Sequence, residues 1–385
     1  MKLISRHIAP IVILVLLLST IVSCHRKPLY LAQRGNVSFT TAVFDIHLDF
    51  LWGEHWKDDL QYPWDESQHG KLGYTEPRGV RAVVYQLDEE LRRTEYLTRH
   101  MSKEGGRVNL ATKENYDMLF YNNDTEYILF DSDGSTYYDA TTRSNTKASY
   151  TRSFDGYNQP DQLFGTLRSG IYVSDDPEDY VMEYAEDGSV LYVYRIEATL
   201  RPYTFIYLYQ VIVLNNTDEE GSRVTGAQGI TANGLARSVN LFTRTTDTTI
   251  ISITQDEIQP LVANHPLSLP DGTDTIGDIF AARLQTWGLP GITPIEEVTR
   301  GVGVEPEDST FVGVGLTLRS GYTYVMQKNV TEQMRSRPAG GIITLVIDAV
   351  KEIPDTLINR PPSDDGFKAT VNEWENGINA DFTIK

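Results

Sequence analysis

The sequence predicts an all-β protein, with two β-sandwich domains that follow an N-terminal signal segment. Three observations lead to this prediction. Runs rich in β-branched and aromatic residues alternate between apolar and polar positions, as strands with one buried face do. Clusters of Gly, Asn and Asp separate these runs, as tight turns require. The chain of 385 residues also exceeds the roughly 250–300 residues at which a single hydrophobic core stops growing.

The first 23 residues have the features of a secretory signal. Lys2 and Arg6 give a positive start, and an apolar run from Ile8 to Ile21 follows. A bilayer span needs about 20 apolar residues, and a short apolar run after a charged start is typical of a cleaved signal. We therefore expect residues 1–23 to be removed.

Cys24 is the only cysteine of the chain, so it has no internal disulfide partner. The residues Ile21-Val22-Ser23-Cys24 resemble the bacterial lipobox, in which the thiol receives a diacylglyceryl group and cleavage makes this cysteine the first residue. The alternative is an N-terminal anchor helix with an incidental cysteine. Stable anchoring takes more than one acyl chain, and a lipoprotein terminus supplies several, palmitate among them. We expect Cys24 to hold the protein on a membrane, with residues 24–36 as a tether.

The charge of the chain excludes one large class of partners. The formal net charge is −19 and becomes −21 once Lys2 and Arg6 are removed. Nucleic-acid binding requires clustered Lys and Arg to neutralise phosphates, so we expect no nucleic-acid partner. The same negative charge disfavours electrostatic docking to anionic lipid, which leaves membrane attachment to the acyl chains.

Residues 42–52 predict the first strand, because Phe44, Ile46, Leu48 and Phe50 fall on alternate positions. Further strands are predicted at residues 190–200, 204–216, 310–321 and 341–350. Among these, 204–216 and 341–350 are apolar on both faces for much of their length, as central strands are.

Two regions interrupt the strand rhythm. Residues 86–101 fit either an amphipathic helix or a charged turn followed by a strand, and the pattern alone leaves both open. Residues 139–189 are polar and predict a large loop at a domain junction. The predicted domains are therefore residues 37–185 and residues 186–385.

The sequence offers little for catalysis or metal binding. Asp45, His47 and Asp49 share one face of the first predicted strand, but the polar face of an edge strand commonly has this composition. We find no HExxH, P-loop or GxSxG motif, and a glycosidase carboxylate pair has no positional support. We therefore predict a protein that is not an enzyme and that needs neither a metal nor a cofactor.

Trp52, Trp56 and Trp64 lie close together in the sequence, with Tyr62 among them. In a secreted protein such a cluster can stack on sugar rings. The preferred interpretation is that Trp52 ends the first strand inside the core and that the other two pack a long loop.

Several segments, in order along almost the whole mature chain, resemble a family of uncharacterised Bacteroidales lipoproteins related to fimbrillins. These segments are FDIHLDFLW (44–52), LFYNNDTEYILF (119–130), ATTRS (140–144), RVTGAQGITANGLARSVNL (223–241), GGIITLVIDAVKEIPD (340–355) and DGFKATVNEWENGINADFTI (365–384). The resemblance implies two transthyretin-like Greek-key β-sandwiches on an outer-membrane lipid anchor, similar to the minor and anchor subunits of fimbriae. It favours the strand alternative within residues 86–101 and brings no catalytic residues.

The resemblance also implies a mode of assembly. In fimbrial relatives, an extended segment of one subunit adds as a strand to the next, so that backbone hydrogen bonds give affinity. Some relatives are first cut after an arginine, and Arg143 and Arg152 are the candidate sites here. Surface-exported relatives carry acidic residues after the lipidated cysteine, whereas this chain has basic ones, so the leaflet that it faces stays open.

Two functions follow. The first is a cell-envelope lipoprotein that acts as a fimbrial anchor, accessory subunit or adhesin and assembles by strand addition with fimbrial subunits. The second is a glycan-binding lipoprotein of a polysaccharide-uptake system, motivated by Trp52, Trp56 and Trp64.

Overall fold

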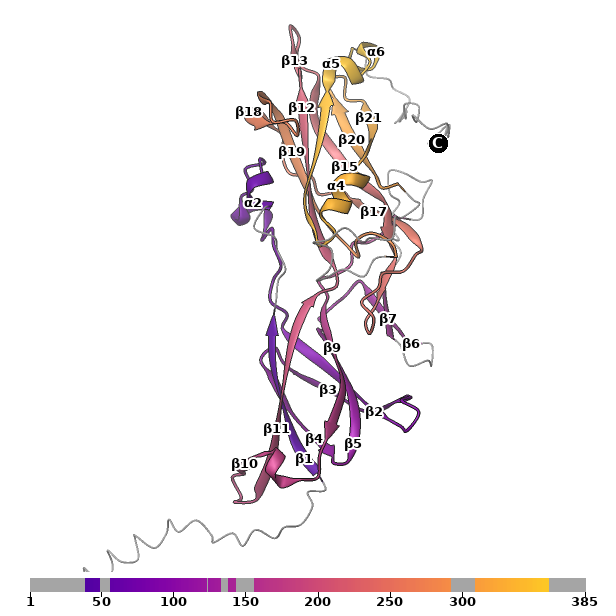
Figure 1. Cartoon of the computed structure of the whole chain (residues 1–385). Coiled ribbons are helices and arrows are strands. Elements are labelled where there is room, and N and C mark those ends of the chain that lie inside the picture. The colour runs from indigo at the N-terminus through magenta and orange to yellow at the C-terminus, as the bar shows by residue number, and fades with distance from the viewer. Residues whose placement is uncertain are drawn as a thin grey trace, which may run out of the picture. The chain divides into compact units, whose positions relative to one another are not determined.

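The computed structural model describes residues 39–48, 56–122, 124–132, 138–142, 156–291 and 309–359. Within these ranges the chain consists mainly of β-strands, joined by turns and by helices of three to six residues (Figure 1). The all-β prediction is confirmed at this level, whereas the two-domain transthyretin-like topology stays a prediction. The predicted signal segment 1–23 and tether 24–36 lie outside the described residues.

The first sheet has eight strands in the order β1-β4-β3-β2-β5-β9-β11-β10. Their bounds are β1 (Phe39–Leu48), β2 (Gly79–Leu87), β3 (Arg93–Ser102), β4 (Gly105–Ala111), β5 (Glu114–Asn122), β9 (Phe164–Val173), β10 (Val181–Tyr184) and β11 (Val190–Pro202). Because β1 also pairs with β11, seven of the strands form a closed ring. The short strand β10 is left outside that ring, at the end of the sheet.

Residues 86–101 form a turn and a strand, as the second of the two alternatives predicts. The Asp88 carboxylate shapes the turn by accepting the N–H groups of Glu90, at 3.0 Å, and Arg92, at 2.8 Å. Leu91 in this turn has a φ of 60°. The strand β3 then pairs with β2 from Leu87↔Arg93 to Gly79↔Ser102. The backbone partners offered by β2 therefore decide against the helix.

Two further sheets share a large hydrophobic cluster. One has the order β18-β19-β12-β22 and the other β21-β20-β15-β17-β8. Their strands are β8 (Gly156–Tyr157), β12 (Phe205–Leu214), β15 (Val224–Ala236), β17 (Ile250–Gln255), β18 (Val262–Ser268), β19 (Asp274–Thr286), β20 (Phe311–Leu318), β21 (Thr323–Asn329) and β22 (Gly341–Asp348). Inward side chains such as Tyr209 of β12 and Val314 of β20 meet in this cluster.

The predicted strands 204–216 and 341–350 are present as β12 and β22. Strand β12 is central, with β19 antiparallel on one side and β22 parallel on the other. Strand β22 stands at the end of its sheet. It is apolar on both faces because Ile343 points into the large cluster while Ile342 packs into a second cluster on the other face.

That second cluster is formed by a segment that we call the strap, residues 59–75. The strap follows the helix α2 (Trp56–Asp59), contains α3 (Glu66–His69), and crosses the sheet that contains β12 (Figure 1). Its residues Tyr62 and Leu72 pack against Leu208 and Ile212 of β12. An early stretch of the sequence thus covers the outer face of a sheet built from the second half of the chain.

Smaller elements complete the described part of the chain. They are β6 (Ile128–Ser132), β7 (Tyr138–Thr142) and β16 (Ser238–Asn240) in a three-stranded sheet, the pair β13 (Thr217–Asp218) and β14 (Gly221–Ser222), and the helices η2 (Pro177–Asp179), α4 (Thr331–Ser336), α5 (Ala349–Glu352) and α6 (Asp355–Ile358). Among the described helices, none has the length and apolar character that a membrane crossing requires.

Contacts between Cα atoms divide the chain into two compact units. The described residues of the smaller unit are 39–41, 109–113 and 173–194, and the larger unit contains the rest. The domain boundary predicted between residues 185 and 186 stays a prediction. In the structure, β11 belongs to the first sheet and β12 begins the next.

Candidate functional site: the β10 edge

The strand β10 is placed by local signals on both sides. Before it, Pro177 begins η2, and the Asp176 carboxylate accepts the N–H of Glu178 at 2.9 Å. After it, a turn closed by the hydrogen bond from Ala185 N–H to the Ser189 carbonyl, 2.9 Å, leads into β11. Gly188 adopts a φ of 82° in this turn, a conformation that glycine reaches without steric cost. The result is a hairpin of β10 and β11.

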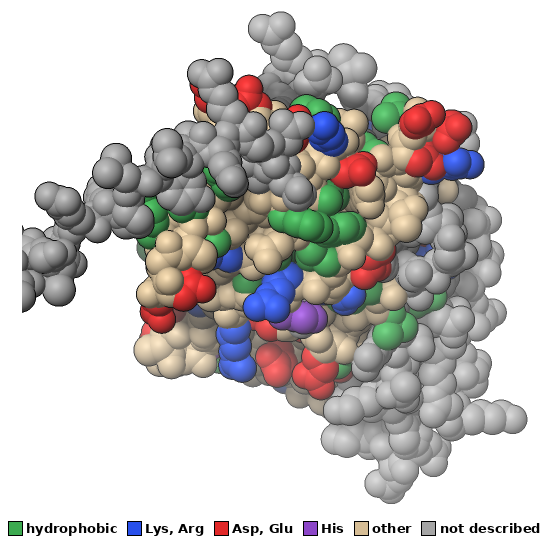
Figure 2. Space-filling model, turned by 90° about the horizontal axis from the view of Figure 1, so that it is seen from below, with side chains coloured by type: hydrophobic (Ala, Val, Ile, Leu, Met, Phe, Trp, Pro, Cys, Tyr) green, Lys and Arg blue, Asp and Glu red, His purple; other side chains and the backbone are tan. Residues whose placement is uncertain are grey.

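The outer edge of β10 is open and apolar. Val181, Met182 and Tyr184 are exposed at 57%, 59% and 53%. One side of β10 pairs with β11, from Val181↔Val193 to Tyr184↔Val190, and no strand in the described part of the chain pairs with the other side. Figure 2 views the end of the molecule at which Figure 1 draws β10, and hydrophobic side chains gather near the middle of this face. We call residues 181–184 the β10 edge.

Three tyrosines pack together next to the β10 edge, on β11 and in the residue before β10. The Tyr180 ring contacts the rings of Tyr192 and Tyr194 edge-on, at centroid distances of 6.3 and 6.1 Å, and its hydroxyl donates to the Ser174 carbonyl. Thr40 of β1 donates its hydroxyl to the Tyr192 carbonyl at 2.7 Å. These contacts fix the hairpin, so that the exposed side chains stand on an ordered base.

Acidic residues surround the β10 edge. Seven carboxylates lie between Val173 and Tyr194, a range without Lys or Arg: Asp175, Asp176, Glu178, Asp179, Glu183, Glu186 and Asp187. Asp175 pairs with Lys113 at 3.0 Å. The Asp187 side chain accepts from Ser189, and these hydrogen bonds lower the pKa of Asp187. The surroundings of the β10 edge therefore carry a negative charge at neutral pH.

Two other sheet ends in the described part of the chain, β22 and β18, are protected. At β22, the Gln333 side chain of α4 donates to the Thr344 carbonyl at 2.9 Å and accepts the Thr344 N–H at 2.8 Å. At β18, Pro266 removes a donor and the register shifts between Val262 and His265. Side-chain caps, prolines and bulges are the usual means by which edge strands avoid pairing with other chains. The β10 edge contains no proline, and its register with β11 is regular from Val181 to Tyr184.

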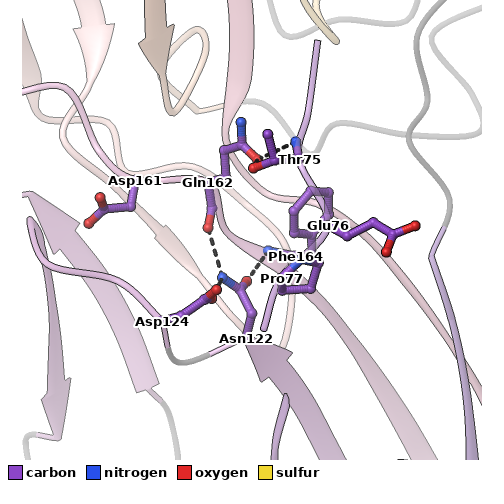
Figure 3. A pocket seen from close by; sticks show the side chains of 8 residues that line it. All are labelled: Thr75, Glu76, Pro77, Asn122, Asp124, Asp161, Gln162 and Phe164. Atoms are coloured by element: carbon purple, nitrogen blue, oxygen red, sulfur yellow. Dashed lines mark hydrogen bonds between the residues drawn. The ribbon is translucent and has the colours of Figure 1, made fainter. Parts of the chain in front are cut away.

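A polar pocket lies elsewhere, where the strap ends beside β5 and β9 (Figure 3). Its cavity measures about 210 Å³ and is lined by Thr75, Glu76, Pro77, Asn122, Asp124, Asp161, Gln162 and Phe164. Asn122 accepts the Phe164 N–H at 2.6 Å and donates to Asp124 at 2.8 Å and to the Gln162 carbonyl at 2.9 Å.

The acidic residues of this pocket are used within the fold. Asp124 accepts the N–H of Arg78 at 2.9 Å, and Asp161 accepts the N–H of Glu126 at 2.6 Å. Glu76 forms an ion pair with Lys103. These carboxylates hold the loops at the strand ends in place, so the residues of the pocket have a structural role.

The tryptophans of the predicted glycan site can be placed only in part. Trp52 lies outside the described residues, as do Cys24, Arg143 and Arg152, and Trp56 is in α2 but its side chain is not described. Trp64 lies in the strap and is partly buried against the second cluster. Its indole N–H donates to the Gly70 carbonyl at 3.0 Å, and its ring contacts those of Tyr62 and His69. Trp64 therefore packs the strap.

Asp45 and His47 lie on β1, whereas Asp49 lies outside the described residues. Asp45 approaches Arg195 at 3.4 Å. Across the described ranges, no group of three or more His, Cys, Asp or Glu side chains is arranged to hold a metal ion. The prediction of a large loop over residues 139–189 is wrong, because this range contains the strands β9 and β10, and the sequence reasoning therefore missed the β10 edge. Its available signal was the alternation in residues 181–184 between two Asp-rich turns.

Residues 64–254 match the model of a domain of unknown function, DUF5119. No curated protein matches the chain. Solved structures similar to this chain include a candidate adhesin from Bacteroides ovatus, at 15% identity and a TM-score of 0.44, with 81% of this chain and 93% of that chain covered. Another is the fimbrial anchor protein Mfa2 from Porphyromonas gingivalis, at 10% identity and a TM-score of 0.38, with 80% and 90% covered.

A third is a candidate polysaccharide-binding protein from Bacteroides thetaiotaomicron, at 7% identity and a TM-score of 0.36, with 80% and 91% covered. The resemblance found in the sequence is confirmed to this extent. The matching family model has no assigned function, and the matching structures include candidate adhesins and a fimbrial anchor protein.

Proposed function

We propose that this protein is a non-enzymatic lipoprotein of the outer membrane that acts as a fimbrial anchor, accessory subunit or adhesin. Lipid on Cys24 attaches it to the membrane, and a partner in the cell envelope adds a strand to the β10 edge. The observation that carries the proposal is that the β10 edge is open and apolar while the edges of β18 and β22 are protected.

The physical basis of the proposal is edge pairing. An unpaired edge presents a row of N–H and C=O groups that an extended segment of another chain can bind. Desolvation strengthens such pairing, and burial of apolar side chains contributes about 25 cal/mol for each Å² removed from water. Met182 and Tyr184, which lie two positions apart and so on the same side of β10, supply that apolar area.

A single substitution on β10 tests this proposal. Met182→Lys places a charge on the edge, and charged side chains are a common block to edge pairing. We expect affinity isolation from cross-linked cells to recover several-fold less of the partner envelope subunits with this variant than with the wild type. The matched control is Ile276→Lys, because Ile276 is also an exposed apolar strand residue, at 67%. Equal recovery from both variants would contradict the proposal.

The anchor is tested separately. Cys24→Ala removes the thiol that would carry the lipid, so we expect metabolic labelling with an alkyne fatty acid to be lost and the protein to leave the membrane fraction. Persistence of the label on Cys24→Ala would show that the lipid is attached elsewhere or that another segment anchors the chain.

Glycan binding is the second candidate function. It is favoured by the exposure of Tyr184 on the same hairpin as the ring contacts of Tyr180 with Tyr192 and Tyr194, because aromatic faces can stack on sugar rings. A glycan array probed with the wild type and with Tyr184→Ala separates the two functions. Saccharide binding that disappears in the variant would favour the glycan role.

A further inference from the structure

We infer that the β10 edge selects a partner strand of one chemistry, namely an extended segment whose apolar residues are flanked by Lys or Arg. The inference rests on the proposed function, because it takes the β10 edge to be a docking surface. It adds the kind of partner that fits this surface and the two residues of β10 whose backbone groups receive it.

The hydrogen bonds of the hairpin decide which backbone groups of β10 face outward. The Ala185 N–H donates to the Ser189 carbonyl at 2.9 Å, so these two residues form a hydrogen-bonded pair. In an antiparallel ladder, hydrogen-bonded and non-hydrogen-bonded pairs alternate. Met182 and Tyr184 therefore occupy non-hydrogen-bonded positions opposite β11, and their N–H and C=O groups point to the free side of β10.

The other strand of the hairpin agrees with this phase. Tyr192 is the register partner of Met182, and its carbonyl accepts the hydroxyl of Thr40, on β1, at 2.7 Å. This carbonyl is thus directed away from β10, as a non-hydrogen-bonded position requires. No strand in the described ranges pairs with the free side of β10, so two N–H and two C=O groups are available to one added strand.

The side chains at the same two positions determine the apolar part of the partner. Met182 and Tyr184 are exposed at 59% and 53%, and they lie on the same side of β10. Opposite and diagonal side chains of neighbouring strands contact each other, so a partner strand places its alternate side chains against these two. Removal of apolar surface from water favours apolar residues at those positions.

Exposed carboxylates determine the flanks of the partner. Asp175 and Glu183 already interact with other residues of the chain, and the argument for charge does not depend on them. Glu178, Asp179 and Glu186 are exposed, and none of the three forms an ion pair with the described part of the chain. Their charges are therefore available to a partner.

These three carboxylates lie close enough to act on a bound strand. Each belongs to a residue within three positions of an end of β10, Val181–Tyr184. Three residues of chain span at most about 11 Å, close to the Debye length of about 10 Å at 0.1 M salt. Because acidic residues both precede and follow β10, basic residues on both flanks are attracted whether the partner runs parallel or antiparallel.

A second copy of this chain is a poor occupant of the β10 edge for the same reason. Two such edges would bring two sets of carboxylates together, and like charges on neighbouring strands oppose pairing. We expect the mature chain to sediment as a monomer at neutral pH. A dimer that Met182→Lys dissociates would overturn the inference, because the occupant would then be a second copy.

Peptide binding to the mature chain tests the inference. Three labelled peptides share the core Thr-Val-Thr-Val-Thr and carry two Lys, two Gln or two Glu residues at each end. At 0.1 M salt we expect fluorescence anisotropy to show that the Lys peptide binds about tenfold more tightly than the Gln peptide, the difference expected from three exposed ion pairs. The Glu peptide should bind more weakly still, and 0.5 M salt should remove most of these differences.

Two matched triple variants separate local charge from net charge. E178Q/D179N/E186Q removes three charges beside β10 and should abolish the preference for the Lys peptide. The control E89Q/E219Q/D256N makes the same change of net charge at three exposed positions of the larger unit and should keep the preference. A preference for the Lys peptide that survives in E178Q/D179N/E186Q would overturn the inference.

Hydrogen exchange on the same complexes locates the bound peptide. We expect the amides of Met182 and Tyr184 to exchange more slowly when the Lys peptide is bound. Protection only at other strands, equal affinity for the Lys and Gln peptides, or no binding of any peptide would each overturn the inference. Equal affinity would still leave the proposed function standing, whose own failure appears as equal partner recovery from Met182→Lys and Ile276→Lys.

Discussion

At the scale of single residues, Gln210 shows how one buried side chain joins distant parts of the chain. It lies on β12 and is fully buried. Its carbonyl oxygen accepts the N–H of Gln61 at 3.0 Å and of Tyr62 at 3.4 Å. Its amide group donates to the Asp59 carbonyl at 2.9 Å and to the Thr344 hydroxyl at 2.8 Å. All four bonds link the strap or β22 to β12.

Replacing Gln210 by Leu keeps the approximate volume and removes these bonds. Buried N–H groups left without a partner cost about 1–3 kcal/mol each, so we expect Gln210→Leu to lower the free energy of unfolding by about 2–4 kcal/mol. Chemical denaturation measures this change. Gln68→Leu in the exposed part of the strap is the control and should change stability little. A Gln210→Leu variant as stable as this control would contradict the role assigned to Gln210.

Asp348 gives a prediction for pH. It caps α5 by accepting the N–H groups of Val350 and Lys351, both at 3.1 Å. Its hydrogen bonds to the Lys351 side chain and to Asn215 help to lower its pKa from 3.8 to about 2. Because the pKa is lower in the folded state, Asp348 contributes stability above about pH 4 and loses this contribution as the pH falls toward 2.

We therefore expect the difference in stability between the wild type and Asp348→Asn to be constant above about pH 5 and to shrink between about pH 4 and pH 2. Thermal unfolding as a function of pH measures it. A difference that stays constant through this range would show that the carboxylate does not titrate as proposed.

At the scale of elements, the sheet ends decide what the molecule can contact. The Gln333 amide imitates a neighbouring strand by bonding both backbone groups of Thr344. The carboxylate of Glu352 accepts the N–H of Asp348 at 2.9 Å. Two positions along the free side of β22 are thus occupied by side chains from the helices that flank it.

Gln333→Ala should open this edge. We expect a loss of about 1–2 kcal/mol in stability from two hydrogen bonds, together with faster self-association at high concentration, because an uncovered apolar edge pairs with other chains. Light scattering during incubation measures the second effect. Glu332→Ala removes the preceding side chain, whose pair with Arg335 is exposed, and should leave self-association unchanged. Equal scattering by the two variants would contradict a protective role for Gln333.

The elements that sequence reasoning found are those with long periodic patterns. The runs that became β1, β12, β20 and β22 contain enough alternating or continuous apolar residues to be recognised alone. The choice between helix and strand at residues 86–101 depends on β2 as a partner, which periodicity does not report. The strand β10 was missed because four residues between acidic turns carry too little pattern, and its exposure is a property of the assembled sheet.

At the scale of the whole chain, a third hydrophobic cluster joins the first sheet to segments of the second half. Val83 of β2 and Leu119 of β5 meet residues 236–242 and Trp287 in this cluster. Tyr203 lies within it, between the end of β11 and the start of β12, and its hydroxyl donates to the Leu241 carbonyl at 3.0 Å. Burial raises the pKa of Tyr203 to about 12.

Tyr203→Ala and Tyr203→Phe separate packing from hydrogen bonding at this joint. Removal of a buried aromatic ring costs about 3–5 kcal/mol, whereas loss of the hydroxyl alone costs about 1 kcal/mol. We expect calorimetry to show a broader transition or two transitions in Tyr203→Ala and a single, slightly shifted transition in Tyr203→Phe. A Tyr203→Ala variant that unfolds like Tyr203→Phe would show that the cluster does not couple the two parts.

Sequence reasoning predicted the all-β class from strand periodicity along the chain, and it found the general resemblance from segments that follow one another in the same order as in the family. It could not predict contacts between segments that lie far apart in the sequence. Gln61 of the strap lies 149 positions before its partner Gln210 on β12, and no local pattern signals that Tyr62 and Leu72 pack against that strand. For the same reason, the sequence alone does not show that Trp64, which could have stacked on sugar rings, packs instead against the second hydrophobic cluster.

The strap has a consequence for the order of events during biogenesis. Its residues leave the ribosome long before the strands they cover have been made, and Ile342 of the same cluster comes from β22, at the end of its sheet. Contacts of such high sequence separation form slowly. Packing of the strap must therefore be a late step of folding, and a chain interrupted before β22 would leave Tyr62 and Leu72 exposed to proteases and chaperones.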